Sequence, residues 1–466
     1  MRRLAELPVL WRYILLAAIA TSFVSALRCI DTRSSTHATT AIHVKYRPGK
    51  VQLHAHAGQV VRPLFQHLRT TAAHDDVRLR WVRIEVPSDR AGELLAELAR
   101  DPDVETALVP PVVSLPRVST LRRPADGESC PIHTPSYEAH QGYLGPAPHG
   151  IDAPAAWRRG VLGQGVWFAD IEGGWNAKHE DLPGDRIFHV SGRSTLDRSW
   201  RAHGTAVLGE VVGRDNGKGV VGIAPEVERV VTSSIFGTTV AEAIDAAAEN
   251  LRPGDVLLIE LQGIGPRRRF LPMEFWDDNF DVIKTATDRG VIVVEAAGNG
   301  NEDLDHKTYG GKLSRSGRDS GAIMVGAGGP PRDGFDDRAK LDFSNYGSRV
   351  DVQGWGRKVA TLDYGDLQSC AGVENDQGDR DYTNEFAGTS SASPIVAGAA
   401  VLLQSYAKQH GRVLSPHEIR DILAHTGSPQ TSDPRKNIGP RPDLARALLR
   451  VQRYATSPAG FEPAVR

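Results

Sequence analysis

From residue 150 onward, short runs of β-branched residues alternate with longer segments whose apolar residues recur every three or four positions. The runs predict buried strands, and the longer segments predict helices that bury one face. Strands are predicted at 166–174, 255–260, 291–299 and 322–326, and helices at 152–159, 240–249, 280–288, 393–409 and 415–425. Strands that alternate with helices are typical of an open parallel sheet flanked by helices. The fold class predicted for residues 150–455 is therefore α/β.

Residues 41–113 are predicted to form a separate, small α+β domain of ferredoxin-like pattern. Strands are predicted at 41–46, 77–86 and 104–109. A helix is predicted at 60–73 and a second one from Ser88, because apolar residues recur there at helical spacing. The apolar positions are Val61, Leu64, Phe65 and Leu68 in the first helix and Ala91, Leu94, Leu95 and Leu98 in the second.

The two ends of the chain and the segment between the domains carry no core pattern. Residues 1–26 begin with two arginines, continue into an apolar stretch and end in Val-Ser-Ala, which predicts a cleaved export signal. The alternative is that this segment stays uncleaved and anchors the protein in a membrane. No other membrane contact is expected. Residues 114–149 are predicted to be a linker, and 456–466 a disordered tail. Maturation is predicted within 114–130, and the protein is expected to be secreted or extracytoplasmic.

Charge and cysteine content narrow the functional classes. The formal net charge of −2 gives no reason to expect a nucleic-acid partner. Of the three cysteines, Cys29 lies at the boundary of the predicted signal, and Cys130 and Cys370 remain. In an oxidising compartment they could form one disulfide, and two free thiols are the alternative.

The segment 388–394, Gly-Thr-Ser-Ser-Ala-Ser-Pro, places Ser390 at the junction between a loop and a predicted helix. Its small neighbours let a substrate backbone approach the hydroxyl, and the free N–H groups of a helix N-terminus can hold an oxyanion. Plain helix capping by Thr389 or Ser390 would use the same residue types.

A nucleophilic serine needs a base, and the base needs an orienting acid. His203 opens an Ala/Val-rich helical stretch and is the candidate base. Glu172 and Asp170 end an apolar strand and are candidate acids. Asn299 ends another strand, where its amide could donate to an oxyanion.

Acid, His, Asn and Ser, in this order and in these contexts, resemble the subtilases, the subtilisin-like serine proteases. The resemblance covers about residues 140–450 and includes the motifs His-Glu-Asp-Leu at 179–182, Gly-Ile-Ala-Pro at 222–225 and Ala-Gly-Asn at 297–299. It implies a serine endopeptidase that acts on peptides or proteins and needs no cofactor. It also implies that the small domain is a propeptide, which inhibits the active site until it is cleaved. The substrate-gripping residues implied are Glu260, Leu261, Gln262, Gly263, Ala297 and Gly298.

The acid position departs from the family pattern, which has Asp there. A gapless alignment anchored on residues 179–182 places Glu172 at this position, with Gly174 after it. Asp170 lies two residues earlier and so shares the same strand face. We favour Glu172 as the acid and keep Asp170 as the alternative. The departure also supports a rival hypothesis, a catalytically inactive binding or scaffold protein.

Two further expectations concern metal and specificity. The family resemblance implies a structural Ca²⁺ site at Asp181 and Asn216, and a metal-free turn is the alternative. Glu260 and Glu295 lie near the groove walls, and residues 363–381 are rich in acids. If one of these carboxylates faced a pocket, the enzyme would prefer basic or polar residues near the scissile bond.

Overall fold

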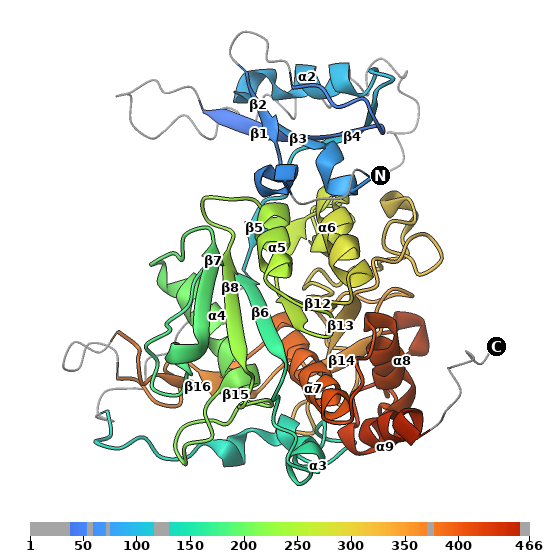
Figure 1. Ribbon diagram of the computed structural model, residues 1–466. Coiled ribbons are helices and arrows are strands. Elements are labelled where there is room, and N and C mark those ends of the chain that lie inside the picture. Colours follow the sequence, from blue (N-terminus) through green and yellow to red (C-terminus); the bar gives the residue numbers. More distant parts are fainter. Residues whose placement is uncertain (1–37, 54–58, 71–74, 116–129, 371–376, 457–466) are drawn as a thin grey trace, which may run out of the picture.

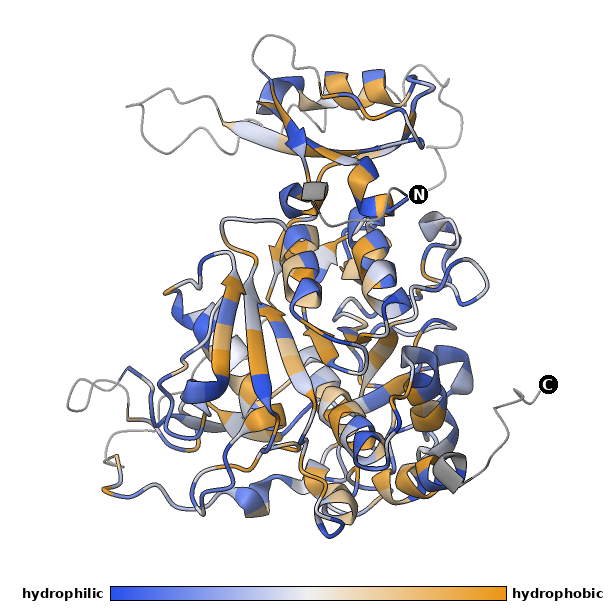
Figure 2. Ribbon diagram, viewed as in Figure 1, coloured by the Kyte–Doolittle hydropathy of each residue, from blue (hydrophilic) through white to orange (hydrophobic). Residues whose placement is uncertain are grey.

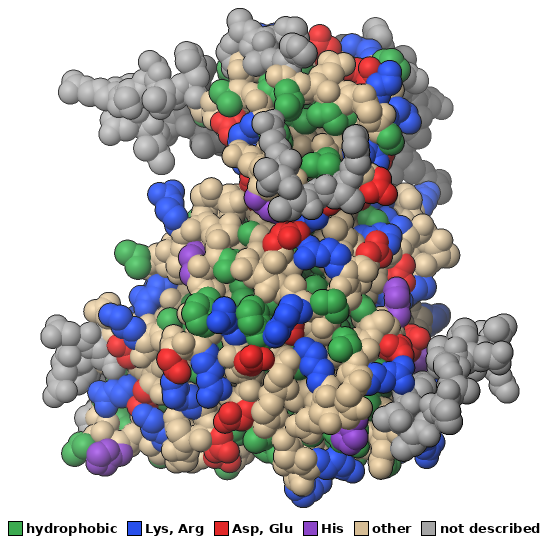
Figure 3. Space-filling model, viewed as in Figure 1, with side chains coloured by type: hydrophobic (Ala, Val, Ile, Leu, Met, Phe, Trp, Pro, Cys, Tyr) green, Lys and Arg blue, Asp and Glu red, His purple; other side chains and the backbone are tan. Residues whose placement is uncertain are grey.

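The computed structural model describes residues 38–53, 59–70, 75–115, 130–370 and 377–456 (Figure 1). The predicted export signal, most of the predicted maturation segment and the tail from residue 457 lie outside the described residues. Over the described ranges, no helix is both long and apolar enough to cross a membrane. The small N-terminal domain sits on one end of a larger domain (Figures 1 and 3). Figure 3 shows basic and acidic side chains interspersed over this face of the larger domain, in keeping with the small net charge.

The larger domain is built on a parallel sheet, which within the described residues has seven strands. In spatial order they are β14 (Val352–Trp355), β13 (Ile323–Gly328), β12 (Ile292–Ala296), β9 (Val256–Ile259), β6 (Trp167–Glu172), β8 (Arg229–Ser234) and β7 (Ile187–Ser191). Helices cover both faces (Figure 1), so the predicted α/β class is confirmed.

Strand alternation directs side chains to two separate cores. Phe168 of β6 packs with α4 (Arg198–Val212) and α7 (Thr389–Gln409), whereas Ala169 and Ile171 pack with α5 (Val240–Glu249) and α6 (Asp277–Asp288). The helix surfaces turned toward the sheet are the apolar ones (Figure 2). The remaining helices are α3 (Ala153–Trp157), α8 (Pro416–Thr426) and α9 (Leu444–Thr456). Both faces of the sheet are buried, which explains why the strands β9, β12 and β13 are mainly apolar.

The small domain is an antiparallel sheet with the order β2-β3-β1-β4 and one α-helix, α2, in the described residues. Its elements are β1 (Thr39–Tyr46), β2 (Val60–Pro63), β3 (Trp81–Pro87), α2 (Ala91–Leu98) and β4 (Val104–Leu108). The strands predicted at 41–46 and 104–109 and the second predicted helix match these elements. Of the strand predicted at 77–86, only the part from Trp81 is correct, because Val77–Arg80 form a 3₁₀ helix. Ser88, the predicted start of that helix, lies in a short 3₁₀ turn before it and makes no capping bond there.

The helix predicted at 60–73 is wrong over its described part. Residues Val60–Pro63 form strand β2, which pairs with β3, and only a 3₁₀ helix follows at Gln66–Thr70. The apolar residues that suggested a helix, Leu64, Phe65 and Leu68, pack instead into the core beside α5 and α6. Burial against the other domain therefore explains their spacing.

The two domains meet through oppositely charged surfaces around this apolar contact. The small domain contributes basic groups, and α5 and α6 contribute carboxylates. The pairs across the interface include His43–Asp278 (2.7 Å), Lys45–Asp281 (2.9 Å), Arg62–Glu242 (3.2 Å), His67–Asp245 (3.1 Å), Arg78–Asp245 (2.7 Å) and Arg78–Glu249 (2.5 Å). Such complementarity sets the register in which the domains dock.

Candidate active site

Ser390 lies in the first turn of α7, which begins at Thr389 and not, as predicted, at residue 393. Gly388 precedes the helix with φ +115°, a conformation that L side chains rarely adopt. The Ser390 hydroxyl is buried and has no hydrogen-bond partner among the described residues. The hydroxyl of Ser391, by contrast, donates to the carbonyl of Trp355 at 2.9 Å. Ser390 therefore carries the free hydroxyl at this helix N-terminus.

His203 projects from α4 toward the carboxyl end of β6. Its Nδ1 lies 2.6 Å from Oε2 of Glu172, and both side chains are fully buried. The other oxygen of Glu172 accepts the N–H of Gly173 at 2.8 Å, which fixes the carboxylate. Nε2 of His203 has no partner within the described part of the chain. The imidazole is thus held by Glu172 on one side and has a free nitrogen on the other.

Asp170, the alternative acid, does not contact His203. Its Oδ2 accepts the indole N–H of Trp175 at 2.6 Å. Burial raises the pKa of the Asp170 carboxyl well above its usual range, and the nearby charge of Glu172 raises it further. Asp170 is therefore a buried group that is hydrogen-bonded to Trp175 and lies behind the site.

The Asn299 amide has one end held and the other end free. Its Oδ1 accepts the backbone N–H of Thr389 at 2.8 Å. The backbone N–H of Asn299 donates to Oε1 of Gln262 at 2.8 Å. Its Nδ2 has no partner among the described residues. A fixed amide with a free N–H₂ is the arrangement that an oxyanion donor requires.

Sequence reasoning missed the residue that shapes this turn, Asn345. Its Oδ1 accepts the N–H groups of Gly300 (3.0 Å) and Glu302 (2.9 Å), and its Nδ2 donates to the carbonyl of Ala297 at 2.6 Å. A Cβ on Gly298 would approach that Nδ2 to 2.8 Å. An asparagine in a polar loop carries no sequence signal for this role, because its partners lie more than 40 residues away.

Two more buried carboxyl groups lie near the histidine. One carboxyl oxygen each of Glu172 and Glu260 and one ring nitrogen of His203 all lie within 4.8 Å of one another. Glu210 follows His203 by two turns on α4 and acts electrostatically on Glu260. Neither Glu260 nor Glu210 has a hydrogen-bond partner for its carboxyl oxygens among the described residues. Glu260, predicted to grip substrate, thus points instead into the site's interior, and sequence reasoning did not identify Glu210.

The predicted groove wall is occupied by the chain itself. β10 (Gln262–Ile264) pairs with β11 (Phe270–Pro272) on one side and with β5 (Val113–Ser114) on the other, both antiparallel. Gln262 lies opposite Ser114, and Gly263 lies opposite Val113. The segment that leaves the small domain therefore lies as an added strand along the wall that contains Gln262 and Gly263.

A pocket of about 400 Å³ opens beside Asn299. Its lining residues are Ser114, Leu115, Gln262, Phe270, Asn299, Phe343, Arg357, Ala387 and Gly388. None of these is acidic. The acid Glu295 is instead buried and accepts the N–H of Glu274 at 2.8 Å. The pocket thus offers no carboxylate for the expected preference for basic residues.

The charged group in this pocket is Arg357. Its guanidinium lies 4.8 Å from the ring centre of Phe343, and no described carboxylate pairs with it. An unpaired guanidinium beside aromatic rings favours an anionic or aromatic guest.

The predicted calcium residues are already bonded to each other. Asn216 Nδ2 donates to Asp181 Oδ1 at 2.8 Å, and the N–H of Val220 donates to Asp181 Oδ2 at 2.9 Å. Burial raises the pKa of Asp181 to about 6. Each of these oxygens keeps a second lone pair, so a calcium ion at Asp181 and Asn216 stays a prediction.

Cys130 and Cys370 form a disulfide across 240 residues of sequence. The disulfide alternative is therefore the one observed. It ties the segment that enters the larger domain to the loop that precedes β16 (Tyr382–Phe386) and Ser390.

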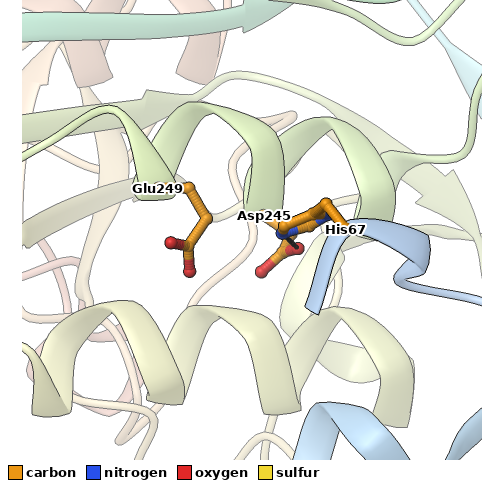
Figure 4. A group of neighbouring side chains, drawn as sticks. All are labelled: His67, Asp245 and Glu249. Atoms are coloured by element: carbon orange, nitrogen blue, oxygen red, sulfur yellow. Dashed lines mark ion pairs between the residues drawn. The ribbon is translucent and has the colours of Figure 1, made fainter. Parts of the chain in front are cut away.

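A second group of ligand-type side chains lies at the domain interface (Figure 4). Asp245 and Glu249 project from α5, and His67 reaches Asp245 from the small domain. Arg78 donates to Asp245 at 2.7 Å and to Glu249 at 2.5 Å. Because Arg78 pairs with both carboxylates and Arg289 also pairs with Glu249, the group is an ion-pair cluster of the interface.

The chain is similar to known proteins of one family. The model of the subtilase family matches residues 174–440. Subtilisin Savinase of Lederbergia lenta is 29% identical over 282 residues, which cover 60% of this chain and 89% of its own. An alkaline protease of Alkalihalobacillus alcalophilus is 28% identical over 350 residues, 72% of this chain and 81% of its own.

Among solved structures, a protease of Pseudoalteromonas arctica aligns with a TM-score of 0.51 and 23% identity. The alignment covers 68% of this chain and the whole of that one, and at this identity it supports the fold alone. The match to the family model spans more than half of the chain. The chain therefore belongs to the subtilase family and is a serine-type endopeptidase.

Proposed function

We propose that Glu172, His203 and Ser390 are the catalytic triad of this endopeptidase and that Asn299 completes its oxyanion hole. The observation that carries the proposal is the 2.6 Å contact between Glu172 and Nδ1 of His203, on a ring whose Nε2 is free. Ser390 Oγ and Asn299 Nδ2 are also free among the described residues. These are the atoms that must act on a substrate.

In this mechanism Ser390 Oγ attacks the peptide carbonyl carbon while His203 Nε2 accepts the hydroxyl proton. Glu172 holds the required tautomer and stabilises the imidazolium. The Asn299 amide and the Ser390 backbone N–H donate to the oxyanion. His203 then protonates the leaving amine, and water hydrolyses the acyl-enzyme by the same steps. These steps require no cofactor.

The small domain is proposed to be an inhibitory propeptide. Support comes from its exit strand β5, which lies along β10, and from Leu115, which lines the pocket beside Asn299. A substrate would use the same strand edge, so the two exclude each other. Cleavage is expected close after Leu115, at the start of the predicted 114–130 window.

We also propose that the enzyme is secreted. The apolar segment predicted at 1–26 supports export. The disulfide between Cys130 and Cys370 supports an oxidising compartment, because such bonds are rare in reducing ones.

Labelling with a fluorophosphonate probe tests the triad. Processed wild-type protein should label at Ser390, and His203→Ala should label far more slowly because the hydroxyl is no longer activated. Ser391→Ala is the matched control, since that hydroxyl is engaged by a backbone carbonyl. Equal labelling of wild type and His203→Ala would contradict the triad.

N-terminal sequencing tests processing and secretion together. Secreted wild-type protein should begin shortly after Leu115. Ser390→Ala should retain the small domain if processing is autocatalytic. An active enzyme that keeps its small domain covalently attached would contradict the propeptide assignment.

A further inference from the structure

Glu260 shares the interior of the proposed active site with the triad acid because of the sheet register. In the parallel pair β6–β9, Ile171 lies opposite Ile259, so the next residues, Glu172 and Glu260, end neighbouring strands side by side. Leu258 and Phe168 both pack on the α4 face, and strand alternation sends Glu260 and Glu172 to that same face. His203 approaches from α4 and completes a group within 4.8 Å.

This cluster contains more carboxyl groups than can be ionised at the same time. Asp170 and Glu172 from β6 and Glu210 from α4 act electrostatically on Glu260, and His203 is the one basic group in the cluster. Within the described residues, no lysine or arginine pairs with any of these acids. Burial, and then its acidic neighbours, raise the pKa of the Glu260 carboxyl well above its usual range. Like-charged carboxyls in one dry site cannot all ionise, so some must keep a proton.

We propose that Glu260 is a positioning residue of the catalytic centre, a second buried carboxyl group that exchanges a proton with the Glu172–His203 pair and thereby sets the pH range in which His203 is a free base. The proposal rests on the proposed function of that pair. Three observations carry it: the shared register, the 4.8 Å grouping and the unpartnered oxygens of Glu260, which is only 2% exposed.

The direction of the effect follows from charge. When Glu260 loses its proton beside His203, the new negative charge favours the protonated imidazolium. The two groups then titrate as one coupled system rather than as separate sites. A neutral residue at position 260 removes this coupling, so His203 should lose its proton at lower pH.

Direct titration of His203 tests this without relying on turnover. In full-length Ser390→Ala protein, the midpoint of the pH-dependent change in the NMR signals of the His203 ring should move to lower pH, by about one pH unit, when Glu260→Gln is added. The curve should also become that of a single proton. In processed enzyme with native Ser390, the acid limb of the kcat/KM profile should shift to lower pH by a similar amount.

Glu210→Gln is the matched control, because it removes the other unpartnered carboxyl and keeps the shape. It should shift the His203 titration by less than half as much. An unchanged titration in Glu260→Gln, or an equal shift in Glu210→Gln, would overturn the proposal. If the ring titration shifts as expected but wild-type Ser390 never labels with a fluorophosphonate, the proton exchange stands and the proposed catalytic function falls.

Discussion

The acid of the proposed triad is a glutamate where the family pattern has aspartate. The extra methylene of Glu172 is accommodated because the carboxylate is tied back to the N–H of Gly173 at 2.8 Å while its other oxygen reaches His203. Gly204 follows the histidine, and a Cβ there would approach the Glu172 side chain to 2.7 Å. The absence of a side chain at Gly204 thus gives the longer acid its space.

Removing this acid should be far more costly than removing its neighbour. Glu172→Gln is expected to lower kcat by about 10⁴-fold, since the imidazole loses the group that fixes its tautomer. Asp170→Asn should have a much smaller effect, because an amide can still accept from Trp175. The measurement is kcat on peptide substrate, normalised to labelled active sites. The reverse ranking of the two variants would show that Asp170 is the orienting acid.

Arg357 should determine specificity at the pocket beside Asn299. We expect wild-type enzyme to prefer acidic or aromatic side chains at the substrate position that enters this pocket. Arg357→Glu should reverse the charge preference, by about tenfold or more, since hydrogen bonds to charged groups contribute roughly 1.5–3 kcal/mol. Profiling of a peptide library with both enzymes measures this. Identical rankings for the two enzymes would exclude a role for Arg357.

At the scale of elements, the docking of the small domain depends on a few buried ion pairs. Arg78 is 6% exposed and joins Asp76, Asp245 and Glu249, so it connects its own domain to α5. Loss of one partner from such a network leaves uncompensated buried charge, which typically costs 3–5 kcal/mol.

Arg78→Met should therefore loosen the inhibitory strand. In full-length Ser390→Ala protein, hydrogen exchange of the amides that join β5 to β10 should accelerate by about a hundredfold, as a loss of roughly 3 kcal/mol implies. Arg90→Met is the control, because Arg90 makes only an exposed pair with Glu93. Exchange that is equally slow in both variants would mean that Arg78 does not hold the domains together.

Release of the small domain should accelerate as pH rises. The hydrogen bond to Asp245 raises the pKa of His67 above its ordinary value. A raised pKa means that the docked state is favoured while His67 is protonated, and that this contribution is lost as pH rises through the raised value. Arg78 and Glu249 are the other charged groups that act on this imidazole.

The processed complex allows this to be measured. Complex incubated at a series of pH values, then assayed at one fixed pH, should regain activity faster after incubation at higher pH. His67→Ala should release at a nearly constant, faster rate. A pH dependence that survives in His67→Ala would assign it to other groups, such as His43 beside Asp278.

At the scale of the whole molecule, the disulfide closes a loop of 240 residues. In the chain-entropy view, a long loop makes a disulfide more stabilising, and removal typically costs 2–5 kcal/mol. The paired change Cys130→Ser with Cys370→Ser should lower the free energy of unfolding by about this amount. Urea unfolding of the uncleaved Ser390→Ala protein measures it, with reduction of the native bond as the matched comparison. Unfolding midpoints that coincide would show that the bond stabilises nothing.

The sequence by itself determined the local parts of this protein. Alternating strands and helices predicted the sheet, and the motifs around His203, Asn299 and Ser390 predicted the site, because each motif lies in a helix or turn built by adjacent residues. The start of α7 was placed too late, since Pro394 is typical of a first helical turn. In the folded chain, packing extends the helix one turn earlier, so that Ser390 lies within its first turn.

Only the tertiary structure decided what depends on distant segments meeting. Glu172 and Asp170 share one strand face, so their roles separate only where α4 brings His203 to one of them. Strand register places Glu260 beside this pair. The apolar residues at 64–68 are buried because the two domains dock there. The physical reason is the same each time: burial and charge act through space, whereas periodicity and motifs report only neighbours along the chain.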